Sequence, residues 1–245
     1  MGGVRMMRGV ALAFPPGGIV IHGDSQRLEV KQFNLRLNLA TDWLEVALEQ
    51  LEVSRTAHGK WLAMHKLGGE IDDLFRREFK SAMQATVAAA TFFEALYAAV
   101  RSTLPARLHA QRASGRGKSR RSALVAEQLK RAFGLRTRGS ANVASVITEI
   151  YRFRDEAVHP SSAFEPPAIH PDLDQYVEKR LAMFTFQNAK LIVRAALAYA
   201  QILPTIGLKQ GPRECHELSK QLLSTCGPLF VHWENEYGQL LDPAE

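Results

Sequence analysis

Apolar residues recur every three or four positions over most of the chain, which is the spacing of one face of an α-helix. The longest stretch of this kind contains no helix-breaking residue between Ile71 and Pro105. Its apolar face covers roughly eight helical turns. The residues on that face are Ile71, Leu74, Phe75, Phe79, Met83, Val87, Ala90, Phe93, Leu96 and Val100. We therefore predict one long core helix here.

Shorter stretches with the same spacing predict further helices. We expect Ser140 to cap the helix that leads into residue 159, and Pro171 to occupy a first helical position. Pro204 and the pair Gly211-Pro212 are expected to separate a last helical segment from the one before it. The predicted ranges are about 41–56, 122–133, 140–159, 171–203 and 213–226.

Only the region from Gly18 to Leu39 has the alternation of a β-strand. Ile19-Val20-Ile21 is followed by a Gly-Asp-Ser turn and then by apolar residues at every second position from Phe33 to Leu37. The predicted fold class is thus mainly all-α, an antiparallel helical bundle with a small N-terminal β-hairpin.

The composition is that of an ordinary protein with a sizeable core: 245 residues, 46% hydrophobic and 23% charged. The apolar run before Phe14 is too short for a secretory signal. No uninterrupted apolar run approaches the ~20 residues of a membrane span. We expect a cytoplasmic protein with no membrane partner.

The positive charge is concentrated in one segment. The net charge is +6, yet residues 107–138 contain ten Arg or Lys and only Glu127 as an acid, so the rest of the chain carries −3. No aromatic residue precedes Phe133 in this segment, which favours contacts to phosphates over base stacking. A merely solvated loop is the alternative. The expected phosphate-binding residues are Arg116, Lys118, Arg120 and Arg121.

Cys215 and Cys226 are the only cysteines, so a disulfide framework is excluded and two reduced thiols are expected. A zinc site made by these two residues with His216 and His232 would need paired ligand spacings that the sequence lacks. We expect no metal ion.

The helix that leads into residue 159 places Arg154 at the edge of its apolar face, four residues after Ile150. A buried arginine is costly unless it has a partner or lines a site. Either an ion pair with a carboxylate such as Glu94 or a functional role would explain its position.

Asp155 and His159 are one helical turn apart, and Arg152 precedes Asp155 by three residues. One interpretation is a structural ladder from Arg152 through Asp155 to His159. The other is chemical: Asp155 orients the imidazole, His159 transfers a proton, and a guanidinium binds a phosphate.

Arg154-Asp155, three residues, and then His159, near the end of an apolar helix, resembles the signature of the HEPN (higher eukaryote and prokaryote nucleotide-binding) superfamily. The resemblance implies a helical bundle that forms a homodimer and cleaves RNA without a metal ion or cofactor, leaving 2′,3′-cyclic phosphate and 5′-hydroxyl ends. His159 would be the general acid or base, Arg154 would stabilise the phosphate, Asp155 would orient, and Arg152 would be an auxiliary phosphate contact. Such proteins are often toxins or defence factors, which implies an antitoxin or regulatory partner.

The resemblance covers about residues 69–203 and divides the chain into three parts. Residues 1–60 form an N-terminal extension of hairpin plus helix, residues 69–203 the HEPN-like bundle, and residues 204–245 a C-terminal helical extension. Two alternatives to the ribonuclease stay open: a non-catalytic helical module that binds a nucleotide or a partner, and a DNA-binding regulator.

Overall fold

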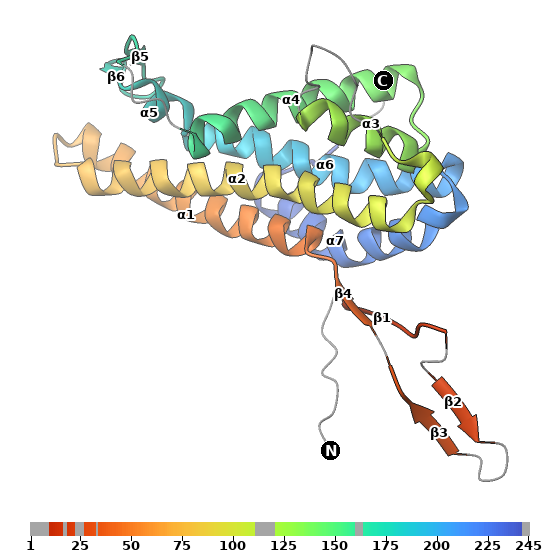
Figure 1. The fold of residues 1–245 in the computed structure, drawn as a ribbon. Helices are drawn as coiled ribbons and strands as arrows, with labels where there is room; N and C mark the ends of the chain where they lie inside the picture. Colours follow the sequence, from red (N-terminus) through yellow and green to blue (C-terminus); the bar gives the residue numbers. More distant parts are fainter. Residues whose placement is uncertain are drawn as a thin grey trace. The chain divides into compact units, whose positions relative to one another are not determined.

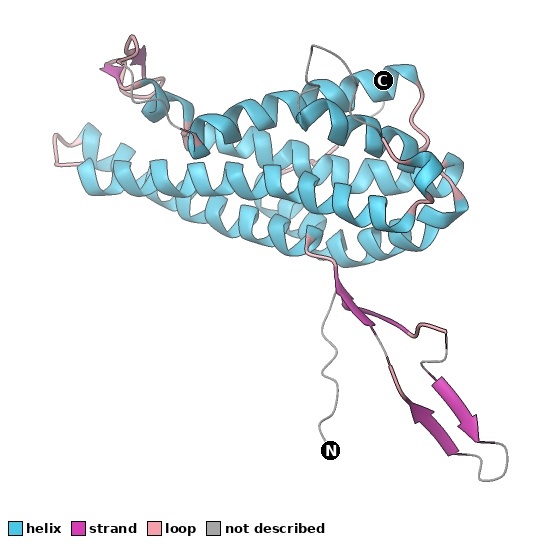
Figure 2. Ribbon diagram, viewed as in Figure 1, coloured by secondary structure: helices cyan, strands magenta, loops and turns pink. Residues whose placement is uncertain are grey.

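A computed structural model describes residues 10–16, 19–22, 27–32, 34–110, 121–159 and 164–241. The chain divides into two compact units, Met1–Leu39 and Ala40–Glu245. Figures 1 and 2 show the first as strands and the second as a bundle of helices. The predicted all-α helical bundle is thereby confirmed.

The first unit is a β-hairpin built from two antiparallel strand pairs. The outer pair joins β1 (Val10–Ala13) to β4 (Asn34–Leu37), and the inner pair joins β2 (Ile19–His22) to β3 (Arg27–Val30). A hairpin that begins at Ile19 is thereby confirmed, but its second strand is Arg27–Val30, and the alternating residues up to Leu37 pair with β1 instead. Strand β1 extends it into the apolar run before Phe14, for which no strand was predicted.

The second unit consists of helices with one further pair of short strands. Helix α2 lies at its centre and packs against α1, α3, α4 and α6, while α7 packs mainly against α6. The helices are α1 (Ala40–Lys66), α2 (Asp72–Thr103), α3 (Arg121–Phe133), α4 (Thr137–Val158), α5 (Lys179–Met183), α6 (Phe186–Gln210) and α7 (His216–Tyr237), with 3-10 turns at Ala106–Leu108 and Arg213–Cys215.

Helix α2 occupies this central place because most of its faces are covered by small or aromatic side chains. Phe92, Phe93 and Leu96 are fully buried, and the alanines around them let neighbouring helices approach closely. Trp61 of α1 is also fully buried, as expected of a core anchor.

Helix α1 continues ten residues beyond its predicted end at Thr56. The apolar pattern stops there because the inward positions of the next turn include His58, which is buried. His58 faces Glu78 of α2, so this part of the core is polar and gives no apolar signal.

Two predictions based on proline were wrong. Pro204 lies inside α6, which runs on to Gln210, and it is buried in the bundle. Pro171 starts no helix; it lies in the turn between β5 (Ala168–Ile169) and β6 (Tyr176–Val177), and α6 begins only at Phe186. Packing of α6 against α2 and α7 outweighs the hydrogen bond that Pro204 removes.

The contact pattern places the division of the chain after Leu39, whereas the sequence assigned α1 and the C-terminal residues to separate extensions. Helices α1 and α7 belong to the same compact unit as residues 69–203 because both bury large side chains in the common core, Trp61 and Trp233 among them.

By length and composition alone, α2 and α6 could each cross a membrane. Both are core helices of this bundle, and core helices pass the same test. The expected cytoplasmic location remains a prediction.

Candidate functional site

Helix α4 carries the predicted motif up to Val158, and His159 follows as the first residue after the helix. Its buried side chains are Val143, Ile147, Ile150 and Tyr151. It begins at Thr137, three residues before the predicted cap Ser140, and no side chain caps it. The last backbone bond runs from His159 N–H to the carbonyl oxygen of Asp155 at 2.9 Å, which leaves the exposed imidazole at the helix end.

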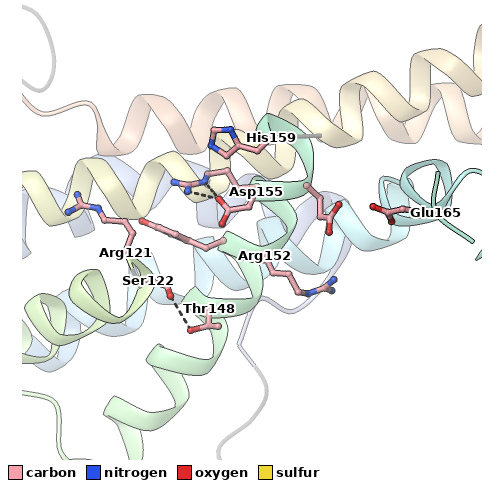
Figure 3. Close-up of a pocket in the computed structure, with 10 residues that line it drawn as sticks. Arg121, Ser122, Thr148, Arg152, Asp155, His159 and Glu165 are labelled. Carbon is pink, nitrogen blue, oxygen red and sulfur yellow. Dashed lines mark hydrogen bonds and ion pairs between the residues drawn. The ribbon is translucent and has the colours of Figure 1, made fainter. Parts of the chain in front are cut away.

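Residues at this helix end line an open pocket of about 660 Å³. It brings together three predicted site residues of α4 and His159, which follows α4, with Arg121 of α3 and Glu165, which follows the motif in the chain (Figure 3). The lining residues are Arg121, Ser122, Thr148, Tyr151, Arg152, Arg154, Asp155, Glu156, His159 and Glu165.

Glu94 of α2 joins α3 and α4 beside the pocket. The Arg121 guanidinium donates from Nε and Nη2 to its carboxylate, at 3.0 and 2.5 Å, and the Tyr151 hydroxyl donates at 2.8 Å. Burial alone would raise the pKa of Glu94, but these bonds outweigh it and lower that pKa. The same contact with Glu94 raises the pKa of Arg121, and burial with Glu94 raises the pKa of Tyr151. All three groups therefore keep their charge states around neutral pH.

Arg154 lies between Glu94 and Asp155. Its Nη1 is 3.7 Å from Glu94 Oε1, which confirms the ion pair considered for it. The closer partner is the neighbouring Asp155, whose Oδ1 accepts from Nε at 3.0 Å and from Nη2 at 2.6 Å. The guanidinium carbon stands 4.6 Å from the centre of the Tyr151 ring. Arg154 is thus held within its own chain, with 24% of its side chain still exposed.

The predicted ladder from Arg152 to His159 is not formed among the described residues. Arg152 donates instead to Glu149, at 2.5 and 3.0 Å, and points away from Arg121 in Figure 3. The Asp155 side chain bonds to Arg154 and makes no hydrogen bond to the His159 ring within the described residues. Asp155 thus bonds to the residue directly before it, Arg154, whereas the helical spacing suggested partners three or four residues away.

The charges that line the pocket balance. Arg121, Arg152 and Arg154 stand against the carboxylates of Asp155, Glu156 and Glu165. The last two also contact the Lys179 ammonium, at 3.5 and 2.9 Å. Each of the three guanidinium groups also bonds to a carboxylate, Arg121 to Glu94, Arg152 to Glu149 and Arg154 to Asp155.

Of the predicted phosphate-binding loop, Arg121 lies in the pocket, and Arg116, Lys118 and Arg120 lie outside the described residues. The flanking basic residues are partly paired: Arg131 bonds to Glu127 at 2.8 Å, and Arg107 approaches Glu214 at 3.8 Å.

Both cysteines are buried. The Cys226 sulfur is 3.5 Å from the Thr41 hydroxyl, and burial raises the pKa of Cys215 to about 11. Within the described residues, no three His, Cys, Asp or Glu side chains are grouped so that they could hold a metal ion.

Sequence reasoning missed Tyr151, Ser122, Thr148, Glu156 and Glu165 as parts of the site. A detectable signal existed only for Tyr151, a large polar-tipped side chain at the edge of the apolar face of α4. Searches against protein-family models, curated proteins and solved structures find no match for the chain.

Proposed function

We propose that the protein is a metal-independent endoribonuclease that acts as a homodimer. The observation that carries this proposal is the position of His159 and Arg154 in one open pocket at the end of α4. Imidazole is the side chain best suited to transfer protons near neutral pH, and guanidinium binds phosphate oxygens in a fixed fork.

Cleavage of RNA by its own 2′-hydroxyl requires two proton transfers. The RNA 2′-hydroxyl loses a proton as its oxygen bonds to phosphorus, and the 5′-oxygen gains a proton as its bond to phosphorus breaks. Each chain offers one histidine in the pocket. Two copies of the motif facing each other would supply both a base and an acid, which is the chemical reason to expect a dimer.

Arg154 is available for a phosphate despite its pairing. Glu94 already accepts three hydrogen bonds from Arg121 and one from Tyr151, so Arg154 is the weakest of the contacts that keep it charged. Asp155 is 55% exposed and bonds through a single oxygen. Exposed pairs of this kind contribute about 0–1 kcal/mol, so a phosphate can replace the Asp155 carboxylate.

An apolar pocket of about 340 Å³ next to the motif supports the dimer. Val158, the residue before His159, is 50% exposed and shares this pocket with Trp43, Met83 and Val87. An apolar surface beside the motif is what a second copy would cover if the two motifs faced each other.

The test is cleavage of RNA in the presence of EDTA. The wild type is expected to cleave, and His159→Ala and Arg154→Ala are each expected to lose about a hundredfold or more in rate. Matched controls are His65→Ala and Arg76→Ala, which remove exposed residues outside the pocket. Equal rates in all variants, or no cleavage by the wild type, would contradict the proposal.

One observation favours a second candidate, a non-catalytic module that binds a nucleotide or a partner. The lining arginines and carboxylates of the pocket are equal in number, which suits a zwitterionic or hydrogen-bonding ligand. Thermal stabilisation by a nucleotide without cleavage of RNA would support this module over the nuclease.

A further inference from the structure

A second pocket, of about 530 Å³, lies on another side of Arg121. Its polar lining comes from the end of α2, the turn after it and the start of α3: Tyr97, Arg101, His109 and Arg121. Unlike the motif pocket, it has no carboxylate among the described residues that line it.

Tyr97 organises the two arginines. The Arg101 Nη1 donates to the Tyr97 hydroxyl at 2.6 Å, and the Arg121 guanidinium carbon stands 4.3 Å from the centre of the Tyr97 ring. Tyr97 is only 6% exposed, so its ring is fixed in the core. Both guanidinium groups are thereby held in place before any ligand arrives, which lowers the entropy lost on binding.

The two arginines differ in whether a carboxylate neutralises their charge. Arg121 is matched by Glu94, through three short contacts. Arg101 is exposed and forms no ion pair within the described residues. His109 is positioned by its ring Nε2, which lies 3.0 Å from the Leu104 carbonyl oxygen and donates to it. The second pocket thus has a surplus positive charge and several hydrogen-bond donors.

We propose that this second pocket binds a phosphate group, and that its source is the RNA strand at a phosphate adjacent to the one cleaved. The proposal rests on the ribonuclease function for the identity of the ligand, but its chemistry does not depend on cleavage. Arg121 lines both pockets, so a strand that passes from one to the other would follow this side chain. Phosphate contacts by fixed guanidinium groups position a strand without reading its sequence.

The test is the affinity of the full-length protein for a 2′-O-methyl oligoribonucleotide, which lacks the attacking hydroxyl, measured at several salt concentrations. Arg101→Ala is expected to weaken binding about tenfold and to reduce the salt slope by about 0.7. Arg101→Lys, which keeps the charge, should retain the slope. Arg76→Ala, an exposed arginine elsewhere on α2, serves as the matched control and should bind like the wild type.

Equal oligonucleotide binding by Arg101→Ala and Arg76→Ala, or none by the wild type, together with no stabilisation of the wild type by inorganic phosphate, would overturn the second pocket as a phosphate site. Loss of binding in Arg101→Ala with no cleavage by the wild type would uphold the pocket and contradict only the ribonuclease function. Inorganic phosphate alone identifies the source: an increase in unfolding temperature that Arg101→Ala abolishes, without any effect on the oligonucleotide, would contradict the RNA strand as the ligand.

Discussion

The Arg154 guanidinium donates two hydrogen bonds to a single oxygen of Asp155, and none of the described contacts joins that carboxylate to the His159 ring. Asp155 therefore occupies the position on Arg154 that the proposed function gives to a phosphate oxygen. Under the proposed function it would compete with the RNA phosphate, which differs from the orienting role that the sequence suggested for it.

Asp155→Asn tests this relationship. Removing the negative charge leaves Arg154 with one carboxylate neighbour, Glu94, and we expect RNA to bind about threefold to tenfold more tightly. Stability should change by less than about 1 kcal/mol because the pair is exposed. Affinity for the 2′-O-methyl oligonucleotide measures the effect. If affinity is unchanged while cleavage is lost, Asp155 acts on His159 instead.

Glu94→Gln should destabilise the bundle. The substitution keeps the shape but leaves Arg121 and Arg154 without their shared counter-charge, at a cost of about 2 kcal/mol for a partly buried network. Tyr151→Phe removes a single hydrogen bond and should cost about 1 kcal/mol. Urea unfolding measures both.

The matched control for Glu94→Gln is Glu127→Gln, which breaks an ion pair with Arg131 at the surface of α3. It should cost less than about 0.5 kcal/mol. Equal losses in Glu94→Gln and Glu127→Gln would show that Glu94 does not join α3 to α4.

The helices were predictable where their cores are apolar. From Ile71 to Val100 the sequence shows α2 almost completely, because most of its inward positions are apolar or alanine, although Glu78, Ser81 and Thr86 are buried as well. The second half of α1 was missed because His58 points inward, and its partner Glu78 is distant in sequence. The prediction that Pro204 ends a helix was wrong for a related reason. Proline usually breaks a helix, but packing of α6 against other helices stabilises it through this position.

The polar core around Glu78 should make stability depend on pH. Glu78 accepts from His58, from Trp61 Nε1 and from the Phe186 N–H at 2.7 Å. The hydrogen bond to Glu78 raises the pKa of His58. Its contribution is fully present below the unfolded pKa of about 6.5 and is lost as pH rises through the higher folded pKa. The stability difference between wild type and His58→Gln should therefore shrink above about pH 6.5.

His170, which is 1% exposed, provides the opposite case. Burial lowers its pKa, so its contribution is present above about pH 6.5 and is lost as pH falls. The difference between wild type and His170→Gln should grow as pH rises. Unfolding temperatures of both variants across this range decide the matter, and parallel pH dependences would refute the assignment.

Gly134 closes α3 in a conformation that favours glycine, with φ of 66°. A Cβ there would lie 2.4 Å from the Gln210 carbonyl oxygen, so Gly134→Ala should cost at least about 2 kcal/mol. Gly139→Ala is the matched control, because a Cβ meets nothing within 4 Å and alanine favours the helix by up to about 1 kcal/mol. Urea unfolding should give opposite signs for the two variants; a loss of similar size in both would contradict the close approach at Gly134.

The candidate site was only partly predictable. The sequence placed Arg154 at the edge of the apolar face and named Glu94 as a possible partner, and helical geometry was sufficient for that. It could not show that Arg121 from the basic segment reaches Glu94, since that contact spans 27 residues and depends on how α2 and α3 pack. It also could not show whether Asp155 pairs with Arg154 or with His159, because the side-chain rotamers decide that pairing.

The chemical identity of the RNA ends tests the central claim most directly. A short RNA incubated with the wild type in EDTA should yield 2′,3′-cyclic phosphate and 5′-hydroxyl ends, and a 2′-O-methyl group at the cleaved nucleotide should abolish the reaction. His159→Ala should yield neither end, while His65→Ala should match the wild type. Products with 5′-phosphate ends, or cleavage that survives His159→Ala, would contradict the proposed role of His159.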